Sequence, residues 1–568
     1  MFLALAYFLL IHLTLLIPGY VFIRKTGFFQ KSPALELPLA YVATLAFYAL
    51  LAALTYVLNI NPLWSRGLSW LLIGAGIFIF VRDGLWRDVV AKYRFPLVCL
   101  AAMSLFSLIF ISLPFNAPRT IVPDPTPQPD RNYSAFNVKV LNVAQTQAND
   151  NYVPYRQAQF FINRSDPAKD SFIDEWGVNF FVRTPLMGAV TANYFNLLGD
   201  RPPVDYTWSS SAQDLGHTYK KFQVLAQVLN TLFIIPAFFI IARLFNKKTA
   251  YISLLFMIPS IYFVYNAFFS WPKSLVAFFI LTSWLLLLEK RLRATVLAGA
   301  VSGVAYLTHD LAVLYIGASF LYLLLNKRFR ELVFFTIPTI ILALPWLITA
   351  SVIYHKPSNF IYYPISTEGI PPLGEQERVL DQFLHTSPLK LIKIRIENLA
   401  YLLSPYQLLS SEGGQIISNR LWALSLFSIP GALGLGLLVP AFIAVFKKLR
   451  SLEIAVFIFV PVILSTLAIG WPKGLGALHF AQAVVVLLIG LSVYFLASLK
   501  RKAWLLAAFL ANTAQLAYFT AFSYEFRVDK WFSSVGAVIL LVVMVAIVTG
   551  CGWMIYRVSQ STEGKLVV

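Results

Sequence analysis

Apolar stretches of membrane-spanning length recur about fifteen times along this chain of 568 residues. A helix needs about 20 mostly apolar residues to cross the hydrocarbon core of a bilayer. Hydrophobic residues make up 58% of the chain and charged residues only 12%, whereas soluble domains carry about 25% charged residues. Because so apolar a chain cannot be covered by a water-soluble surface, the sequence predicts an all-α polytopic membrane protein with about fifteen transmembrane helices.

Two long polar segments divide the predicted spans into three groups. The chain then reads as N-terminal transmembrane helices (1–114), a large extracytoplasmic loop (115–221), central transmembrane helices (222–353), a second extracytoplasmic loop (354–421) and C-terminal transmembrane helices (422–568). The spans are predicted near 1–23, 35–58, 68–81, 95–114, 222–242, 250–267, 274–288, 294–308, 311–325, 332–353, 422–446, 454–469, 478–498, 503–520 and 533–556.

The positions of the basic residues test this assignment of spans and loops, because cytoplasmic connections are enriched in Lys and Arg. The basic clusters fall on alternate connections and therefore on one side of the membrane. They are Arg24–Lys25, Arg82–Arg94, Arg243–Lys248, Lys290–Arg293, Lys327–Arg330, Lys447–Arg450 and Lys500–Lys502. One span more or fewer would disrupt the alternation. The pattern predicts an outside N-terminus within a retained first span, an inside C-terminus, and two long loops on the outer side.

Charge and motifs exclude several classes of protein. The net charge is +19, but the cations lie in short clusters between apolar runs, so no nucleic-acid partner is expected. The two cysteines, Cys99 and Cys551, each lie inside an apolar run, which argues against a disulfide framework or a cysteine metal site. No phosphate-binding loop, dinucleotide fingerprint or zinc spacing occurs, and the cytoplasmic connections are too short to hold a nucleotide-using domain.

The first outer segment holds the main catalytic candidate. It opens with a proline-rich, extended stretch, Pro123–Asp130, and continues into a predicted helix over Asn149–Phe161. Asp150 or Asn151 can cap this helix, and Pro154 suits its first turn. A carboxylate in this position, facing the membrane from outside, is suited to act as a general base on an incoming acceptor. The alternative is that Asp150 is an N-cap and nothing more.

Further candidates lie in a short outer turn between two spans, Thr308–Asp310. Ionisable groups at a membrane boundary are costly unless they are paired or functional. His309 and Asp310 are therefore candidates for binding a phosphate, orienting a base or holding a cation. The competing interpretation is a capping aspartate beside an interfacial histidine.

A Trp–Pro–Lys trio recurs in two outer turns, Ser270–Leu275 and Gly470–Leu475. Lys273 and Lys473 lie there against the positive-inside trend, where a lysine can neutralise a lipid phosphate as a point charge. Alternatively, both lysines simply extend toward the interface beside the neighbouring tryptophans.

Three other outer residues complete the candidate site. His479 begins a predicted span, and Arg156 and Arg183 lie in the first loop. An arginine can clamp a phosphate through its fork of donors. The alternatives are a structural histidine and two solvated loop charges.

The second outer segment contains a predicted amphipathic helix, Ser387–Leu403. Its residues Leu389, Ile392, Ile396, Leu399 and Leu403 share one helical face, and Lys390, Lys393 and Glu397 lie away from it. Such a pattern is typical of a helix that lies on a membrane surface. We expect it to rest on the outer leaflet and to frame the active cavity.

These motifs together resemble the GT-C superfamily of integral membrane glycosyltransferases, in particular bacterial members related to protein mannosyltransferases and aminoarabinose transferases. In those proteins the first large outer loop begins with an acidic residue followed by a membrane-parallel helix. Asp150 with Tyr152–Ala158 occupies that place here, followed by the Thr184–Leu186 stretch. The turns Trp271–Lys273 and Thr308–Asp310 also look like family features. The likeness covers roughly residues 95–500, and three additional spans precede it.

The resemblance implies a polyprenyl-phosphate-linked sugar as donor, an extracytoplasmic acceptor (glycan, lipid or protein) and inversion at the anomeric carbon. It implies Asp150 as base and Lys273, His309, Asp310, Lys473, His479, Arg156 and Arg183 around the donor phosphate. The usual acidic pair reads Asn149–Asp150, so the resemblance leaves a divalent cation open and implies no other cofactor. Other loop acids remain alternatives for the base, namely Asp124, Asp130, Asp174 and Glu175. The expected location is the bacterial inner (plasma) membrane, with the active site on the periplasmic or extracellular side.

Other functions remain open on the sequence. An O-antigen or polysaccharide polymerase or ligase also has many spans and large outer loops, and relies on Arg and His rather than on a base carboxylate. A transporter usually has charges at mid-span and internal repeats, and this chain has few of the former and no full-length repeat. An assembly protein whose loops bind a partner is the fourth possibility.

Overall fold

We describe the protein from a computed structural model in which every described segment of regular structure is a helix. The structure describes residues 2–27, 32–114, 153–169, 181, 183–202, 216–268, 270–355, 362–368, 376–403, 428–448, 451–472, 482–521 and 527–561. The all-α fold class expected from the sequence is confirmed over these residues.

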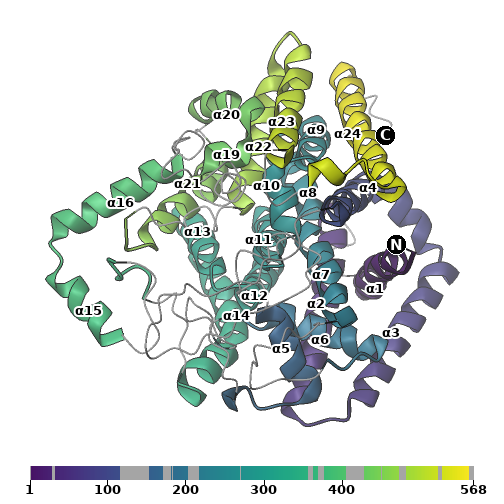
Figure 1. The fold of residues 1–568 in the computed structure, drawn as a ribbon. Helices are drawn as coiled ribbons and strands as arrows, with labels where there is room; N and C mark the ends of the chain where they lie inside the picture. The colour runs from purple at the N-terminus through teal and green to yellow at the C-terminus, as the bar shows by residue number, and fades with distance from the viewer. Residues whose placement is uncertain are drawn as a thin grey trace.

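The helices pack into one bundle from which one pair, α15 and α16, projects to the side (Figure 1). In chain order they are α1 (Phe2–Thr26), α2 (Pro33–Val57), α3 (Pro62–Arg82), α4 (Leu85–Ser112), α5 (Val153–Asn163), α6 (Leu186–Leu198), α7 (Gly216–Thr231), α8 (Ile234–Leu244), α9 (Lys247–Met257), α10 (Ile261–Phe268), α11 (Lys273–Leu288), α12 (Leu292–Thr308), α13 (Ala312–Leu325), α14 (Phe329–Ile348), α15 (Gln376–His385), α16 (Pro388–Leu403), α19 (Ile429–Leu433), α20 (Leu435–Lys448), α21 (Leu452–Leu467), α22 (Gln482–Ser498), α23 (Ala503–Ala521) and α24 (Val535–Gln560).

Every one of the predicted apolar stretches contains helix, but the helices differ widely in length. Seven of the described spans are long and apolar enough to cross a membrane, or eight if the bent pair α9 and α10 counts as one span. Six more apolar helices have 10–17 residues, among them α11, α12 and α13. The protein is therefore polytopic and integral to a membrane, and the count of fifteen spans stays a prediction.

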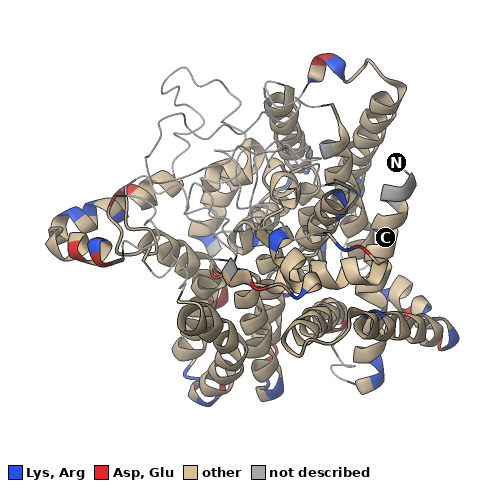
Figure 2. Cartoon of the chain, turned by 60° about the horizontal axis from the view of Figure 1, so that its bottom comes forward, with Lys and Arg blue, Asp and Glu red and all other residues tan. Residues whose placement is uncertain are grey.

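Contacts between helix ends agree with the predicted alternation of sides. Arg24, at the end of α1, pairs with Glu36 at the start of α2 (3.2 Å) and with Asp88 at the start of α4 (2.7 Å). Ser32, before α2, donates to the Glu289 carboxylate after α11 (3.1 Å). These ends, all predicted to be cytoplasmic, lie on the same side of the bundle. Figure 2 shows that most charged residues lie at helix ends or on the projecting pair, while the helix bodies carry few.

The opposite ends of the same helices hold the first outer segment. Arg164, after α5, donates to Asn59 in the turn between α2 and α3 (2.6 Å). Arg66, in the first turns of α3, donates to the Asn196 carbonyl in α6 (2.6 Å). Pro154 lies in the first turn of α5, as predicted. Thus α5 and α6 dock onto the predicted outer ends of the N-terminal helices.

The predicted amphipathic helix exists as α16, and its predicted apolar face is largely exposed, although Leu399 of that face packs against the core. Leu389, Ile392 and Ile396 are all more than half exposed. The opposite face anchors the helix, because Asn398 is buried and donates to the carbonyl oxygens of Ile469 (3.0 Å) and Trp471 (3.1 Å). A largely exposed apolar face on an otherwise anchored helix agrees with the expected position on the membrane surface, which stays a prediction.

The topology makes a prediction that cysteine labelling can test. In a variant lacking Cys99 and Cys551, single cysteines at Lys247 and Lys448 should react only with reagent on the cytoplasmic side. Cysteines at Asn142 and Glu377 should react only from outside, because the basic connections remain cytoplasmic. A membrane-impermeant maleimide applied to intact and to permeabilised cells measures this. A single cysteine that reacts from the opposite side would disprove the predicted topology.

Candidate functional site

Four of the site residues predicted from the sequence lie around the indole ring of Trp271. We call Arg183, Trp271, Lys273, His309 and Asp310 the Trp271 cluster. Arg183 precedes α6, Trp271 and Lys273 lie at the start of α11, and His309 and Asp310 form the turn from α12 to α13. The cluster therefore joins the first outer loop to the central helices, over long separations in sequence.

The Trp271 ring interacts with two cations. The Lys273 ammonium lies 3.1 Å from the ring centroid and the Arg183 guanidinium carbon lies 5.1 Å from it. The face of an indole ring is electron-rich and attracts cations, most strongly where water is excluded. Lys273 is only 3% exposed. It therefore does not extend toward the interface, as the alternative interpretation of this lysine requires. Both positive charges therefore lie against the Trp271 ring.

Hydrogen bonds define the state of His309. The Trp271 Nε1–H donates to His309 Nε2 (2.8 Å), so Nε2 is an acceptor. His309 Nδ1 lies 2.6 Å from the Asp310 carboxylate. Burial lowers the pKa of His309, an effect that the Asp310 carboxylate opposes and that Arg183 and Lys273 reinforce. Through its hydrogen bond to the indole N–H, His309 orients Trp271.

The cluster lies well below the outer end of the neighbouring helix α7. Asn230 of α7 donates to the Trp271 carbonyl (3.0 Å). It follows the first residue of α7, Gly216, by fourteen positions, which corresponds to roughly 21 Å of helix. Helices α11, α12 and α13 have 16, 17 and 14 residues, so at roughly 21–26 Å they are shorter than the hydrocarbon core. The short helices set the cluster into the bundle from the outer side.

The other predicted site residues lie elsewhere or outside the described residues. Arg156 is buried in α5, with its guanidinium 4.9 Å from the Phe160 ring and a hydrogen bond to Gln159 (3.4 Å). It is therefore not a solvated loop charge. The side chain of Gln157, one residue on, donates to the Arg183 carbonyl (2.8 Å) and so ties α5 to the Trp271 cluster. Asp150, Lys473 and His479 lie outside the described residues, as do Asp124, Asp130, Asp174 and Glu175.

Trp271 is the one member of the cluster that is not among the site residues predicted from the sequence. Its recurrence in a second Trp–Pro–Lys turn is the signal that could have identified it. The two turns share a feature: an asparagine side chain from another helix donates to each tryptophan carbonyl, Asn230 to Trp271 (3.0 Å) and Asn398 to Trp471 (3.1 Å). In the described part of the chain, no three His, Cys, Asp or Glu residues group closely enough to hold a metal ion.

Comparison with known proteins supports the resemblance noted in the sequence. Residues 200–355 match the model of the dolichyl-phosphate-mannose-protein mannosyltransferase family. This match confirms the GT-C resemblance. The matched segment runs from the end of the first outer segment to just beyond the end of α14. It includes four residues of the Trp271 cluster, and the fifth, Arg183, precedes it. No curated protein matches the sequence.

Two solved structures are also similar to this GT-C-like chain, both of ArnT from Cupriavidus metallidurans. The apo structure has 13% identity and a TM-score of 0.44, covering 82% of this chain and 74% of that one. The structure bound to undecaprenyl phosphate has 14% identity and a TM-score of 0.45, covering 82% and 75%.

Proposed function

We propose that this protein is a glycosyltransferase that moves a sugar from a polyprenyl-phosphate donor to an extracytoplasmic acceptor. The observation that carries the proposal is the Trp271 cluster, which holds Lys273 and Arg183 together within and beside the segment that matches a mannosyltransferase family. A buried site with an excess of positive charge on the outer side is suited to an anionic, membrane-held donor. The bilayer holds the donor's lipid tail, and the proposed location is the inner membrane of a bacterium.

The charges suit the chemistry of the leaving group. The phosphate of a polyprenyl-phosphate sugar is a diester with one negative charge, and it becomes a monoester with a second charge as the sugar leaves. Cations held beside it therefore bind the transition state more strongly than the ground state, which is what accelerates a reaction. Lys273 and Arg183 fill this role in the proposal, with Lys473, His479 and Arg156 as further candidates.

The proposed reaction is a single displacement. Asp150 removes a proton from the acceptor, the acceptor atom bonds to the anomeric carbon, and the bond from that carbon to the phosphate oxygen breaks. Polyprenyl phosphate leaves with the electron pair, and the configuration inverts. Because Nε2 of His309 already accepts a hydrogen bond from Trp271, we assign His309 and Asp310 to positioning Trp271 and its cations rather than to proton transfer.

A transfer assay tests the function directly. Purified protein in liposomes should transfer sugar from a polyprenyl-phosphate-linked donor to an extracytoplasmic lipid, glycan or protein acceptor, and should not use a nucleotide-linked sugar. The physical reason is that the site lies among membrane helices on the side predicted to be extracytoplasmic. Product is measured by mass spectrometry with a panel of donors and acceptors. Transfer from the nucleotide sugar alone would contradict the proposal.

A further inference from the structure

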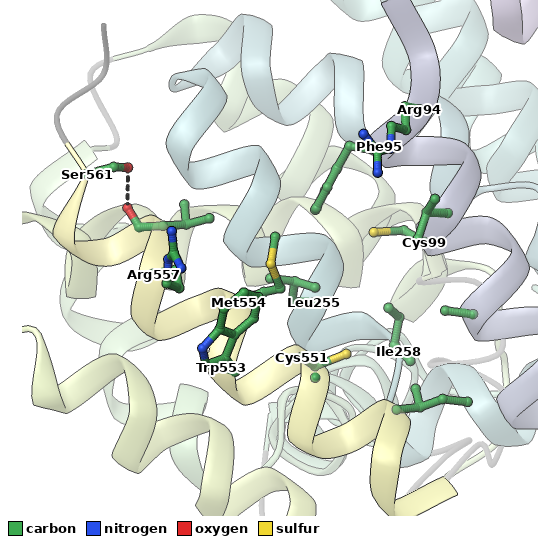
Figure 3. Close-up of a pocket in the computed structure, with 15 residues that line it drawn as sticks. Arg94, Phe95, Cys99, Leu255, Ile258, Cys551, Trp553, Met554, Arg557 and Ser561 are labelled. Carbon is green, nitrogen blue, oxygen red and sulfur yellow. Dashed lines mark hydrogen bonds between the residues drawn. The ribbon is translucent and has the colours of Figure 1, made fainter. Parts of the chain in front are cut away.

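A cavity lies between α4, α9 and α24 (Figure 3). Its volume is about 590 Å³, within the range of roughly 300–1,000 Å³ that small-molecule sites have. Two arginines, Arg94 from α4 and Arg557 from α24, are among the residues that line it. No described residue of its lining is an aspartate or glutamate.

The cavity has a polar end and an apolar end. Arg94, Arg557 and Ser561 lie toward the ends of their helices that the basic clusters predict to be cytoplasmic. Ile547 lies ten residues before Arg557 in α24, or roughly 15 Å deeper along the helix. Apolar side chains line the deeper part, including Leu255 and Ile258. The arrangement is a shaft with cations at its cytoplasmic mouth.

Neither arginine is neutralised by a carboxylate among the described residues. Arg557 lies with its guanidinium carbon 5.0 Å from the Trp553 ring, and Arg94 has no ion pair in this part of the chain. The Lys248 ammonium of α9 donates hydrogen bonds to the carbonyl oxygens of Ser559 (2.7 Å) and Ser561 (2.9 Å). It thereby offsets the negative end of the α24 dipole. An anion at the mouth would meet positive charge.

The cavity is accessible from the surface that the bilayer covers. Val98 and Trp553 both line it and are 57% and 55% exposed. Helix α24 lies at the edge of the bundle (Figure 1). Only 11% of its most apolar 18-residue stretch is buried inside the protein. A lipid of the cytoplasmic leaflet can therefore enter sideways without crossing the protein.

We propose that this cavity binds one anionic glycerophospholipid of the cytoplasmic leaflet. Its phosphate lies between Arg94 and Arg557, and an acyl chain fills the apolar shaft between α4 and α24. Basic pockets between transmembrane helices on the cytoplasmic side favour anionic head groups. The site is separate from the donor site, and the proposal does not depend on the proposed transferase activity.

Native mass spectrometry of the full-length protein in detergent tests the proposal, with phosphatidylglycerol and phosphatidylcholine as probes of matched acyl chains. The unmodified protein should retain one phosphatidylglycerol in preference to phosphatidylcholine. The double variant Arg94→Gln, Arg557→Gln should lower that preference by roughly tenfold to thirtyfold. The matched control is Arg293→Gln, Arg330→Gln, which removes two exposed arginines at predicted cytoplasmic helix ends outside the cavity. It should retain the preference within about twofold.

Several outcomes would overturn the assignment. An unchanged preference in the Arg94→Gln, Arg557→Gln protein would show that the arginines do not select the lipid, and an equal loss in the control would show a general charge effect. Glycerol 3-phosphate that competes as well as the intact lipid would show a surface anion site without a shaft. Displacement of phosphatidylglycerol by an equimolar amount of undecaprenyl phosphate would assign the cavity to a polyprenyl lipid instead.

Discussion

An Asp150→Asn protein should transfer sugar roughly 10²–10⁴-fold more slowly than the unmodified protein, the range that loss of a general base produces. Asparagine has nearly the same shape and caps helices about as well as aspartate, so folding should be almost unaffected. The lost carboxylate leaves no group to take the acceptor proton. The measurement is the turnover rate in liposomes at saturating polyprenyl-phosphate sugar, with thermal unfolding in detergent measured in parallel.

The matched control is Asp166→Asn, because Asp166 is an exposed acid of the same outer segment whose carboxylate accepts from the Ala168 backbone amide (2.9 Å). It should retain normal turnover. Near-normal transfer by a well-folded Asp150→Asn protein would refute the base assignment and direct attention to Asp124, Asp130, Asp174 or Glu175. Retained activity in that variant, combined with loss in Arg183→Gln or His479→Ala, would favour the polymerase or ligase alternative.

A Lys273→Met protein should lose roughly 10²–10³-fold in kcat, the usual cost of removing one group that stabilises developing negative charge. Methionine has similar length and makes favourable contacts with an aromatic ring, so it should still pack against Trp271 while carrying no charge. Because the phosphate gains charge as the sugar leaves, kcat should fall more than donor affinity. Steady-state kinetics over a range of donor concentrations separates the two effects.

Lys247→Met is the matched control, since Lys247 is exposed at the start of α9 on the predicted cytoplasmic side. This variant should differ from the unmodified protein by less than about twofold. A Lys273→Met protein with normal kcat would exclude Lys273 from stabilising the leaving phosphate. A raised KM with unchanged kcat would limit Lys273 to binding of the donor in its ground state.

Much of the framework could be predicted from the sequence. Spans of apolar residues and alternating basic clusters predicted the helical membrane fold, and contacts such as Arg24 with Glu36 and Asp88 place the predicted cytoplasmic ends together. These properties follow from local composition, because a segment's transfer into lipid depends mainly on its own residues. The amphipathic pattern of α16 was readable for the same reason.

The sequence could not show where helices break. The predicted span 250–267 is two helices, α9 and α10, bent by 63° at a short break. The predicted span 68–81 is part of a longer helix, α3, that begins at Pro62 behind an Asn61 cap. Hydrophobicity averages over a window, so it locates a span without locating a bend within it or the residue at which it begins.

Sequence alone identified Lys273, His309 and Asp310 as unusual, because charged or ionisable residues at an outer boundary are costly. Only the tertiary structure placed Arg183 beside them and gave Trp271 its position between the cations and His309. Arg183 and His309 lie far from Trp271 along the chain, and the packing of α6, α7, α11 and α12 brings them to it. Hydropathy and charge order therefore determined the membrane fold, whereas long-range packing of short helices created the buried site.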